Sequence, residues 1–138
     1  MNESIFSERA PDPVGPYPHV KKVNNFLFLS GVGPRKKGSL TIPGVELDED
    51  GNILSYDIEK QARSVFENVR MILEDAGSSW EQLLDVTVFL TNMQDDFDTF
   101  NQIYGEYFKS NKPARTTVEI TALPTPIAIE LKCIASTD

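Results

Sequence analysis

An α+β fold, built as a single β-sheet with two helices packed on one face, is the fold class that this sequence predicts. Two stretches have the three- and four-residue apolar spacing of amphipathic helices, and five short stretches are rich in β-branched or aromatic residues. Their order is strand, strand, helix, strand, helix, strand, strand. That order fits one sheet in one domain, residues 1–138.

The predicted strands are bounded by turn-forming residues. Val20–Val23 and Asn25–Val32 are predicted to form a hairpin around Asn24-Asn25. Residues 35–51 are predicted to be a long connection that ends in the turn signal Asp50-Gly51. The other three predicted strands are Leu83–Thr91, Arg115–Thr121 and Ile127–Ala135.

The first predicted helix runs from about Asp57 to Ala76, with its apolar residues on one stripe. Asp57 suits the N-cap, and Gly77 suits the position where the helix ends. The second predicted helix begins at Asp95 or Asp96 and continues to Phe108. Its predicted buried face is aromatic: Phe97, Phe100, Tyr104, Tyr107 and Phe108.

The composition limits the classes of function. A net charge of -8 argues against a nucleic-acid partner, because phosphates bind basic surfaces. One cysteine and one histidine leave too few ligands for a transition-metal site and exclude an intrachain disulfide. Residues 1–13 contain no apolar run, so we expect no signal peptide or membrane span and a cytoplasmic location.

The last predicted strand places a carboxylate on the sheet face opposite the helices. With period two, Ile129 and Leu131 face the core, whereas Glu130 faces the other side. A lone domain has nothing to cover that side, so we expect it to pack against copies of the same chain. Glu130 would then be a partly buried carboxylate suited to acid–base chemistry. On an uncovered face it would be an ordinary surface residue.

Four cations stand out against the acidic background. Arg115 begins a predicted strand, shares a face with Thr117, and can hold a carboxylate through two parallel hydrogen bonds. The alternative for Arg115 is a surface salt bridge with one of the 21 acidic residues. Arg35-Lys36-Lys37 can clamp an anionic ligand, or they belong to a solvated loop.

Three further residues have chemistry that a site can use. Tyr17 lies between Gly15-Pro16 and Pro18, which can make the loop rigid enough to form a binding wall, although loops of this kind are common. His19, the only histidine, has a side chain of the type that shuttles protons, although a lone loop histidine is more often not catalytic. Cys133 falls on the predicted core face, which favours a small buried apolar group over a nucleophile.

Taken together, these stretches resemble the Rid (RidA/YjgF) family of enamine/imine deaminases over nearly the whole chain. No single stretch decides the resemblance, but their joint order and spacing do. The matching stretches are Ala10-Pro11, Gly15–Tyr17, Leu29–Gly31, Gln61–Val69, Asp85–Thr91, Asn101–Tyr104, Tyr107-Phe108, Pro113–Glu119, Ile129-Glu130 and Ile134-Ala135.

The resemblance implies a homotrimer, or a dimer of trimers, of chorismate-mutase-like subunits. It places three sites in the clefts between subunits, on the sheet face away from the helices, and it implies no metal or organic cofactor. It implies that Arg115 holds the substrate carboxylate and that Glu130 activates the attacking water. The residues that would line the pocket are Tyr17, Ser30, Gly31, Asn101 and Thr117; at the last of these, many family members carry cysteine.

Within the family, the chain is most similar to 2-aminomuconate deaminases. The similarity lies in residues 31–38, the insert 42–45 and residues 123–132. 2-Aminomuconate is a dicarboxylate enamine; Arg115 would bind one carboxylate, and Arg35, Lys36 or Lys37 the other. Its hydrolysis would give 4-oxalocrotonate and ammonia, in aromatic-amine or tryptophan catabolism. The alternatives are a general 2-iminobutanoate/2-iminopropanoate deaminase and a non-catalytic ligand-binding trimer.

Overall fold

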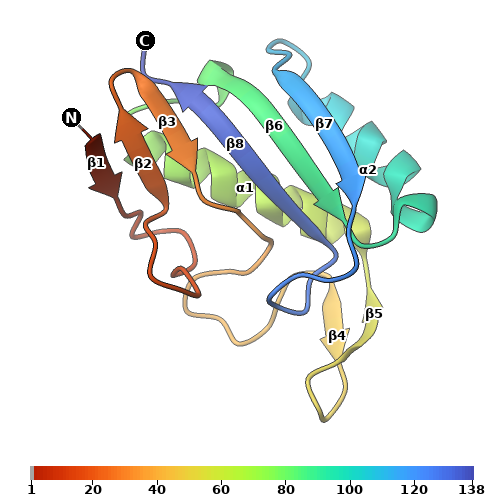
Figure 1. Cartoon of the computed structure of the whole chain (residues 1–138). Coiled ribbons are helices and arrows are strands. Elements are labelled where there is room, and N and C mark those ends of the chain that lie inside the picture. The colour runs from red at the N-terminus through yellow and green to blue at the C-terminus, as the bar shows by residue number, and fades with distance from the viewer. Residues whose placement is uncertain (1) are drawn as a thin grey trace.

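The computed structural model describes residues 2–138 (Figure 1). Its strands are β1 (Asn2–Ile5), β2 (Val20–Val23), β3 (Phe26–Leu29), β4 (Val45–Leu47), β5 (Ile53–Tyr56), β6 (Leu83–Leu90), β7 (Ala114–Glu119) and β8 (Ile129–Ser136). Its helices are α1 (Ile58–Asp75), α2 (Met93–Tyr107) and the short 3-10 helix η1 (Trp80–Gln82). Six strands form one sheet in the order β1-β2-β3-β8-β6-β7, in which only the β6–β7 pair is parallel.

Both α-helices lie on the same side of this sheet, as the sequence predicted (Figure 1). Alternate residues of the central strands are buried against them, which is the period-two pattern of a half-buried sheet. In β8 and β6 these residues are Ile129, Leu131, Cys133, Ala135, Val86, Val88 and Leu90, each exposed by 2% or less. The predicted core face of the last strand is therefore confirmed.

Helix α1 has the predicted caps. The Asp57 side chain accepts a hydrogen bond from the backbone N–H of Lys60 at 3.2 Å. Gly77 follows the last turn with a φ of 83°, a conformation that glycine adopts without strain. The buried stripe also contains three polar side chains that the periodicity does not anticipate: Gln61, Ser64 and Asn68.

Helix α2 packs on α1 through an aromatic cluster. The Phe66 ring lies 4.7 to 6.3 Å, between centroids, from the rings of Trp80, Phe100, Tyr104, Tyr107 and Phe108. The predicted start of this helix at Asp95 or Asp96 is wrong. Asn92 is the N-cap, because its Oδ1 accepts from the N–H of Asp95 at 2.9 Å, and the helix begins at Met93.

The sequence does not predict β1, β4 or β5, and all three are largely exposed. A strand without a buried face lacks the alternation that identifies strands in a sequence. Strands β4 and β5 form a separate hairpin at one end of the sheet (Figure 1). The Tyr56 hydroxyl fastens it to α2 by donating to Asp96 Oδ2 at 2.7 Å.

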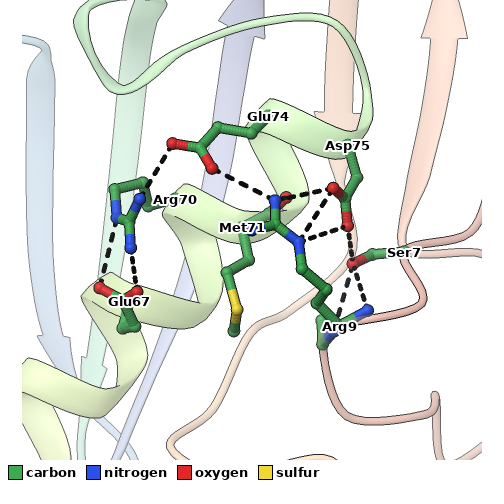
Figure 2. Close-up of polar contacts among 8 residues, drawn as sticks. Ser7, Arg9, Glu67, Arg70, Met71, Glu74 and Asp75 are labelled. Atoms are coloured by element: carbon green, nitrogen blue, oxygen red, sulfur yellow. Dashed lines mark hydrogen bonds and ion pairs between the residues drawn. The ribbon is translucent and has the colours of Figure 1, made fainter.

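The segment after β1 is fastened to the last turns of α1 (Figure 2). The buried Ser7 hydroxyl donates to Asp75 Oδ2 at 2.6 Å. Arg9 Nη2 donates to Asp75 Oδ1 at 2.7 Å and to Glu74 Oε1 at 3.2 Å. These contacts fix the start of the loop that contains Tyr17.

The sheet face away from the helices carries exposed apolar side chains. Those at least 36% exposed on this face are Val23, Phe26, Phe28 and Val118. An apolar patch of this kind is typical of a protein–protein interface. It agrees with the expectation that copies of the chain cover this face, and the homotrimer itself remains a prediction.

Candidate active site

Glu130 lines a pocket where β8 passes the end of β3. Beyond β3, the N–H groups of Val32 and Leu131 donate to each other's carbonyl oxygens at 2.8 and 2.9 Å. This bridge brings Gly31 against Glu130, so close that a Cβ at position 31 would lie 2.6 Å from Glu130 Oε2. A side chain at position 31 would therefore displace the Glu130 carboxyl. The pocket is also lined by Val14, Tyr17, Gly33, Arg35, Pro124, Thr125 and Ile127.

The Glu130 carboxyl is half-buried, and its burial raises its pKa above that of an ordinary glutamate. The Arg35 guanidinium, on the same pocket, acts in the opposite direction and lowers this pKa. A carboxylate with a raised pKa is a stronger base than a solvated one, and a nearby cation keeps the ionised form available. Glu130 thus has the environment of a general base.

Tyr17 and Ser30 lie beside Glu130, where the prediction expects them. Tyr17 lines the Glu130 pocket and the adjoining one, and its hydroxyl accepts from the Val14 N–H at 3.3 Å. Ser30 lines the adjoining pocket, with its hydroxyl donating to the Pro18 carbonyl at 2.7 Å. One chain therefore brings together five of the predicted site residues: Tyr17, Ser30, Gly31, Arg35 and Glu130.

The three consecutive cations of the predicted anion clamp have different surroundings. Arg35 lines both pockets, and its Nη2 donates to the Asp12 carbonyl at 3.0 Å. Lys37 Nζ instead forms an ion pair with Asp12 Oδ1 at 2.9 Å. Lys36 is exposed and lines neither pocket. Arg35 is thus the cation of this run that contributes to the pocket wall.

Arg115 lies in a second cluster, between the edge strand β7 and helix α2. Its Nη1 donates to Asn101 Oδ1 at 2.8 Å, and its guanidinium carbon lies 4.6 Å from the centroid of the Tyr104 ring. Thr117 follows on the same side of β7, with a buried hydroxyl that has no hydrogen-bond partner among residues 2–138. Arg115, Asn101 and Thr117 therefore form a group separate from Glu130.

The two clusters lie on opposite faces of the sheet. Arg115 pairs with Val86, which is fully buried against the helices. Glu130 pairs with Phe89, an odd number of residues further along the same strand, so its side chain points to the other face. Within one chain, Arg115 and Glu130 consequently do not converge. A site that uses both groups needs Glu130 from one subunit and the β7 edge from another.

His19 and Cys133 have structural surroundings. His19 is buried, with Nδ1 accepting from the Ser7 N–H at 2.9 Å and Nε2 lying 2.7 Å from the Pro11 carbonyl oxygen. Both ring nitrogens are therefore engaged by the backbone. Burial raises the pKa of the Cys133 thiol to about 12, which suits a core residue and not a nucleophile.

Two residues that hold the pocket wall were not predicted as site residues. Ser64 and Asn68, on α1, donate hydrogen bonds to the backbone of the loop that carries Arg35. Their signal in the sequence is the presence of polar residues inside the apolar stripe of a helix. That pattern marks them as buried and paired, but it does not show which backbone groups they bind.

Across residues 2–138, no helix is long and apolar enough to cross a membrane. The same residues contain no group of three or more His, Cys, Asp or Glu side chains placed to hold a metal ion. The expectation of a reaction without metal or organic cofactor stays a prediction, which depends on the chemistry that Glu130 can perform unaided.

Residues 7–137 match the family model described as Endoribonuclease L-PSP. The chain is also 41% identical over 133 residues to a RutC family protein of Pyrococcus abyssi, covering 96% of this chain and 95% of that one. A solved structure from Yersinia pestis, described as a member of the conserved Rid protein family, has a TM-score of 0.82 at 33% identity over 99% of both chains. The chain belongs to the Rid (YjgF) family. Its predicted family and fold class are thereby confirmed.

Two further Rid relatives bear on chemistry. Reactive Intermediate Deaminase A, chloroplastic, of Arabidopsis thaliana is 36% identical over 134 residues, which is 97% of this chain and 65% of the relative. The E. coli TdcF structure with bound serine has a TM-score of 0.84 at 30% identity, over 99% of both chains. Neither these nor the two relatives above carry the name 2-aminomuconate deaminase, so that finer prediction remains open.

Proposed function

We propose that this Rid protein is a hydrolase that deaminates small 2-imino and 2-enamino carboxylates. The observation that carries the proposal is Glu130, a half-buried carboxylate of raised pKa that shares a pocket with a cation and a glycine backbone. The Arabidopsis relative is named a reactive intermediate deaminase, and the E. coli relative binds serine, a small amino acid. Both support a small carboxylate with an amino-bearing carbon as the substrate.

The proposed reaction requires only water and proton transfer. The enamine tautomerises to the imine, which makes the amino-bearing carbon electrophilic. Glu130 accepts a proton from water as the oxygen attacks this carbon, and then returns the proton to the departing nitrogen. In the carbinolamine so formed, Glu130 removes the proton of the new hydroxyl group as the carbonyl forms and the carbon–nitrogen bond breaks. This second proton passes to the nitrogen, which leaves as ammonia, and a 2-oxo carboxylate is released. The reaction involves no net oxidation or reduction, so it needs no redox cofactor.

The proposed active site lies between the subunits of a homotrimer. One subunit would contribute Glu130, Tyr17 and Gly31 from the side of its sheet away from the helices. Its neighbour would contribute Arg115, Asn101 and Thr117 from its β7 edge. The placement of the two clusters on opposite faces supports this assembly. Arg115, already oriented by Asn101 and Tyr104, would bind the substrate carboxylate in the bidentate manner of arginine.

A dicarboxylate such as 2-aminomuconate is the substrate that we propose within this class. The supporting observation is Arg35, a second cation on the Glu130 pocket. A 2-imino monocarboxylate is satisfied by Arg115 alone, whereas the far carboxylate of 2-aminomuconate needs another partner. Hydrolysis would then give 4-oxalocrotonate and ammonia.

Ammonia release from 2-aminomuconate and from 2-iminobutanoate, each generated in situ, tests both levels of this proposal. We expect turnover of both, with Arg35→Gln lowering kcat/KM for the dicarboxylate by about tenfold, the effect of one charged hydrogen bond. The matched control is Lys36→Gln, which removes a positive charge outside the pocket and should leave kcat/KM unchanged for both substrates. If Arg35→Gln lowered kcat/KM equally for both substrates, Arg35 would not be the partner of the far carboxylate, and the dicarboxylate proposal would fail. If the protein bound serine but turned over neither substrate, the non-catalytic trimer would be the remaining interpretation.

A further inference from the structure

The chain that follows β3 leaves the sheet with three consecutive backbone carbonyls to satisfy. Val32 still pairs with Leu131, but the next residues turn toward α1 and have no strand beside them. Asn68 Nδ2 donates to the carbonyls of Gly33 and Arg35, at 2.9 and 2.6 Å. Ser64 Oγ donates to the carbonyl between them, that of Pro34, at 2.7 Å. Side chains of one helix therefore replace the missing strand.

Ser64 and Asn68 occupy positions where apolar residues would ordinarily pack. They are exposed by only 6% and 2%, and they lie four residues apart on one face of α1. Burying polar groups costs free energy unless they are hydrogen-bonded, so their presence here has a cause in the loop that they bind. Because α1 packs on the sheet and is capped by Asp57, it offers a rigid base for that loop.

The same helix also holds the strand that carries Glu130. Gln61, fully buried one turn earlier on this face, accepts from the Ala128 N–H through Oε1 at 2.8 Å. Ala128 lies two residues before Glu130. One stripe of α1 is thus bonded to both walls of the pocket.

We propose that Ser64 and Asn68 are positioning residues of the candidate active site: by holding the carbonyls of residues 33–35, they keep the Arg35 guanidinium at the pocket that it shares with Glu130. The catalytic consequence rests on the proposed function, whereas the structural one does not. Neither residue touches the pocket itself, so both act through Arg35.

Loss of these bonds has a consequence for Glu130 that can be measured. Arg35 would keep its bond to the Asp12 carbonyl but lose the fixed backbone behind it. As the cation moves away, its effect on Glu130 weakens, and the carboxyl is left with burial alone. The pKa of Glu130 must then rise, because burial raises it and Arg35 lowers it.

The first arm of the test needs no activity. The carboxyl carbons of glutamate are labelled with 13C, and Glu130 is assigned by its loss in Glu130→Gln and titrated in each variant. We expect its pKa to rise in Asn68→Ala, in Ser64→Ala and in Arg35→Gln. Adding Ser64→Ala to Arg35→Gln should give no further rise, because both changes act through one group. Ser78→Ala is the control, since it removes an equivalent hydroxyl-to-carbonyl bond of 2.6 Å, to Ser136, away from the pocket.

The second arm measures deaminase activity. Asn68→Ala should lower kcat/KM for the dicarboxylate by up to about tenfold, no more than Arg35→Gln, because it acts through Arg35, and it should move the acid limb of the pH profile upward. If Asn68→Ala does not fold, Ser64→Ala, which loses one bond, carries the test. Folded variants in which Glu130 titrates as in the wild type would overturn the inference. Wild-type protein without turnover would overturn the proposed function alone, since the titration remains.

Discussion

The Glu130 pocket and the Arg115 cluster hold their charges in contrasting ways. Glu130 is half-buried, and burial is the dominant influence on its pKa. Arg115 is fixed by a hydrogen bond to Asn101 and by the Tyr104 ring, 4.6 Å from its guanidinium carbon. A proton-transfer group needs a displaced pKa, whereas an anchor for a carboxylate needs a fixed direction. The contrast supports the separate roles proposed for the two residues.

The contrast also has a consequence for assembly. Each cluster holds one of the two charges that the proposed reaction uses, and the sheet between them keeps the charges apart in one chain. The exposed apolar face beside Glu130 and the exposed β7 edge beside Arg115 are the surfaces that two copies would bring together. Oligomerisation would then complete the site as well as cover apolar surface.

Among the substitutions considered, Glu130→Gln should have the largest effect on catalysis. The amide keeps the shape of the side chain but cannot accept a proton from water. We expect kcat to fall by about 10²- to 10⁴-fold, the usual contribution of a general base. Substrate binding, measured by calorimetry with a non-hydrolysable amino acid, should change little because the anchor is Arg115. Wild-type turnover by this variant would remove Glu130 from the proposed mechanism.

Mixing two inactive variants tests whether the clusters meet between subunits. Glu130→Gln and Arg115→Ala are unfolded together in equal amounts and refolded, so that trimers form at random. A shared site is intact when one neighbour supplies Glu130 and the other Arg115, which is about a quarter of sites in a symmetric ring. We expect about a quarter of the wild-type activity to return. If the mixture were as inactive as its components, the proposed site shared between subunits of a trimer would be excluded.

The fold was predictable where side chains alternate between core and surface. The 3.6-residue stripe identified α1, and period two placed Glu130 opposite Ile129 and Leu131. Strands β1, β4 and β5 escaped prediction because they have no buried face. The start of α2 depended on a cap by Asn92, which is as good an N-cap as the aspartates that follow it.

The site was predictable in part. Period two fixes the direction of Glu130, and the same rule predicts correctly that Arg115 and Thr117 share a face. The position of Arg35 was not predictable, because the bonds that hold its backbone come from Ser64 and Asn68, about thirty residues later in the chain. Which backbone a buried polar side chain binds is a property of tertiary packing, and no local pattern encodes it.

The smallest effect is expected outside both clusters, in the polar network of Figure 2. Ser7→Ala removes a hydroxyl that donates to Asp75 and accepts from the Arg9 N–H. We expect the free energy of unfolding to fall by about 1 to 2 kcal/mol, because the buried Ser7 hydroxyl donates to a charged carboxylate and this hydrogen bond is lost. Urea denaturation at a fixed protein concentration measures this change, with the exposed Ser110→Ala as control. The value of kcat should stay within about twofold, since Ser7 does not line either pocket.

The pH dependence separates this network from the active site. The bond from Arg9 lowers the pKa of the Asp75 carboxyl below its ordinary 3.8. A lowered folded-state pKa means that the stabilisation is present above the unfolded value and is lost as the pH falls through the folded one. Wild type should therefore be more stable than Asp75→Asn at neutral pH, and the two should converge in acid below pH 3.8. Glu130→Gln should diverge from wild type in the other sense, gaining relative stability as the pH rises, because a raised pKa penalises the charged form. A stability difference for Asp75→Asn that persisted unchanged in acid would show that the Arg9 contact is not what fastens the N-terminal segment to α1.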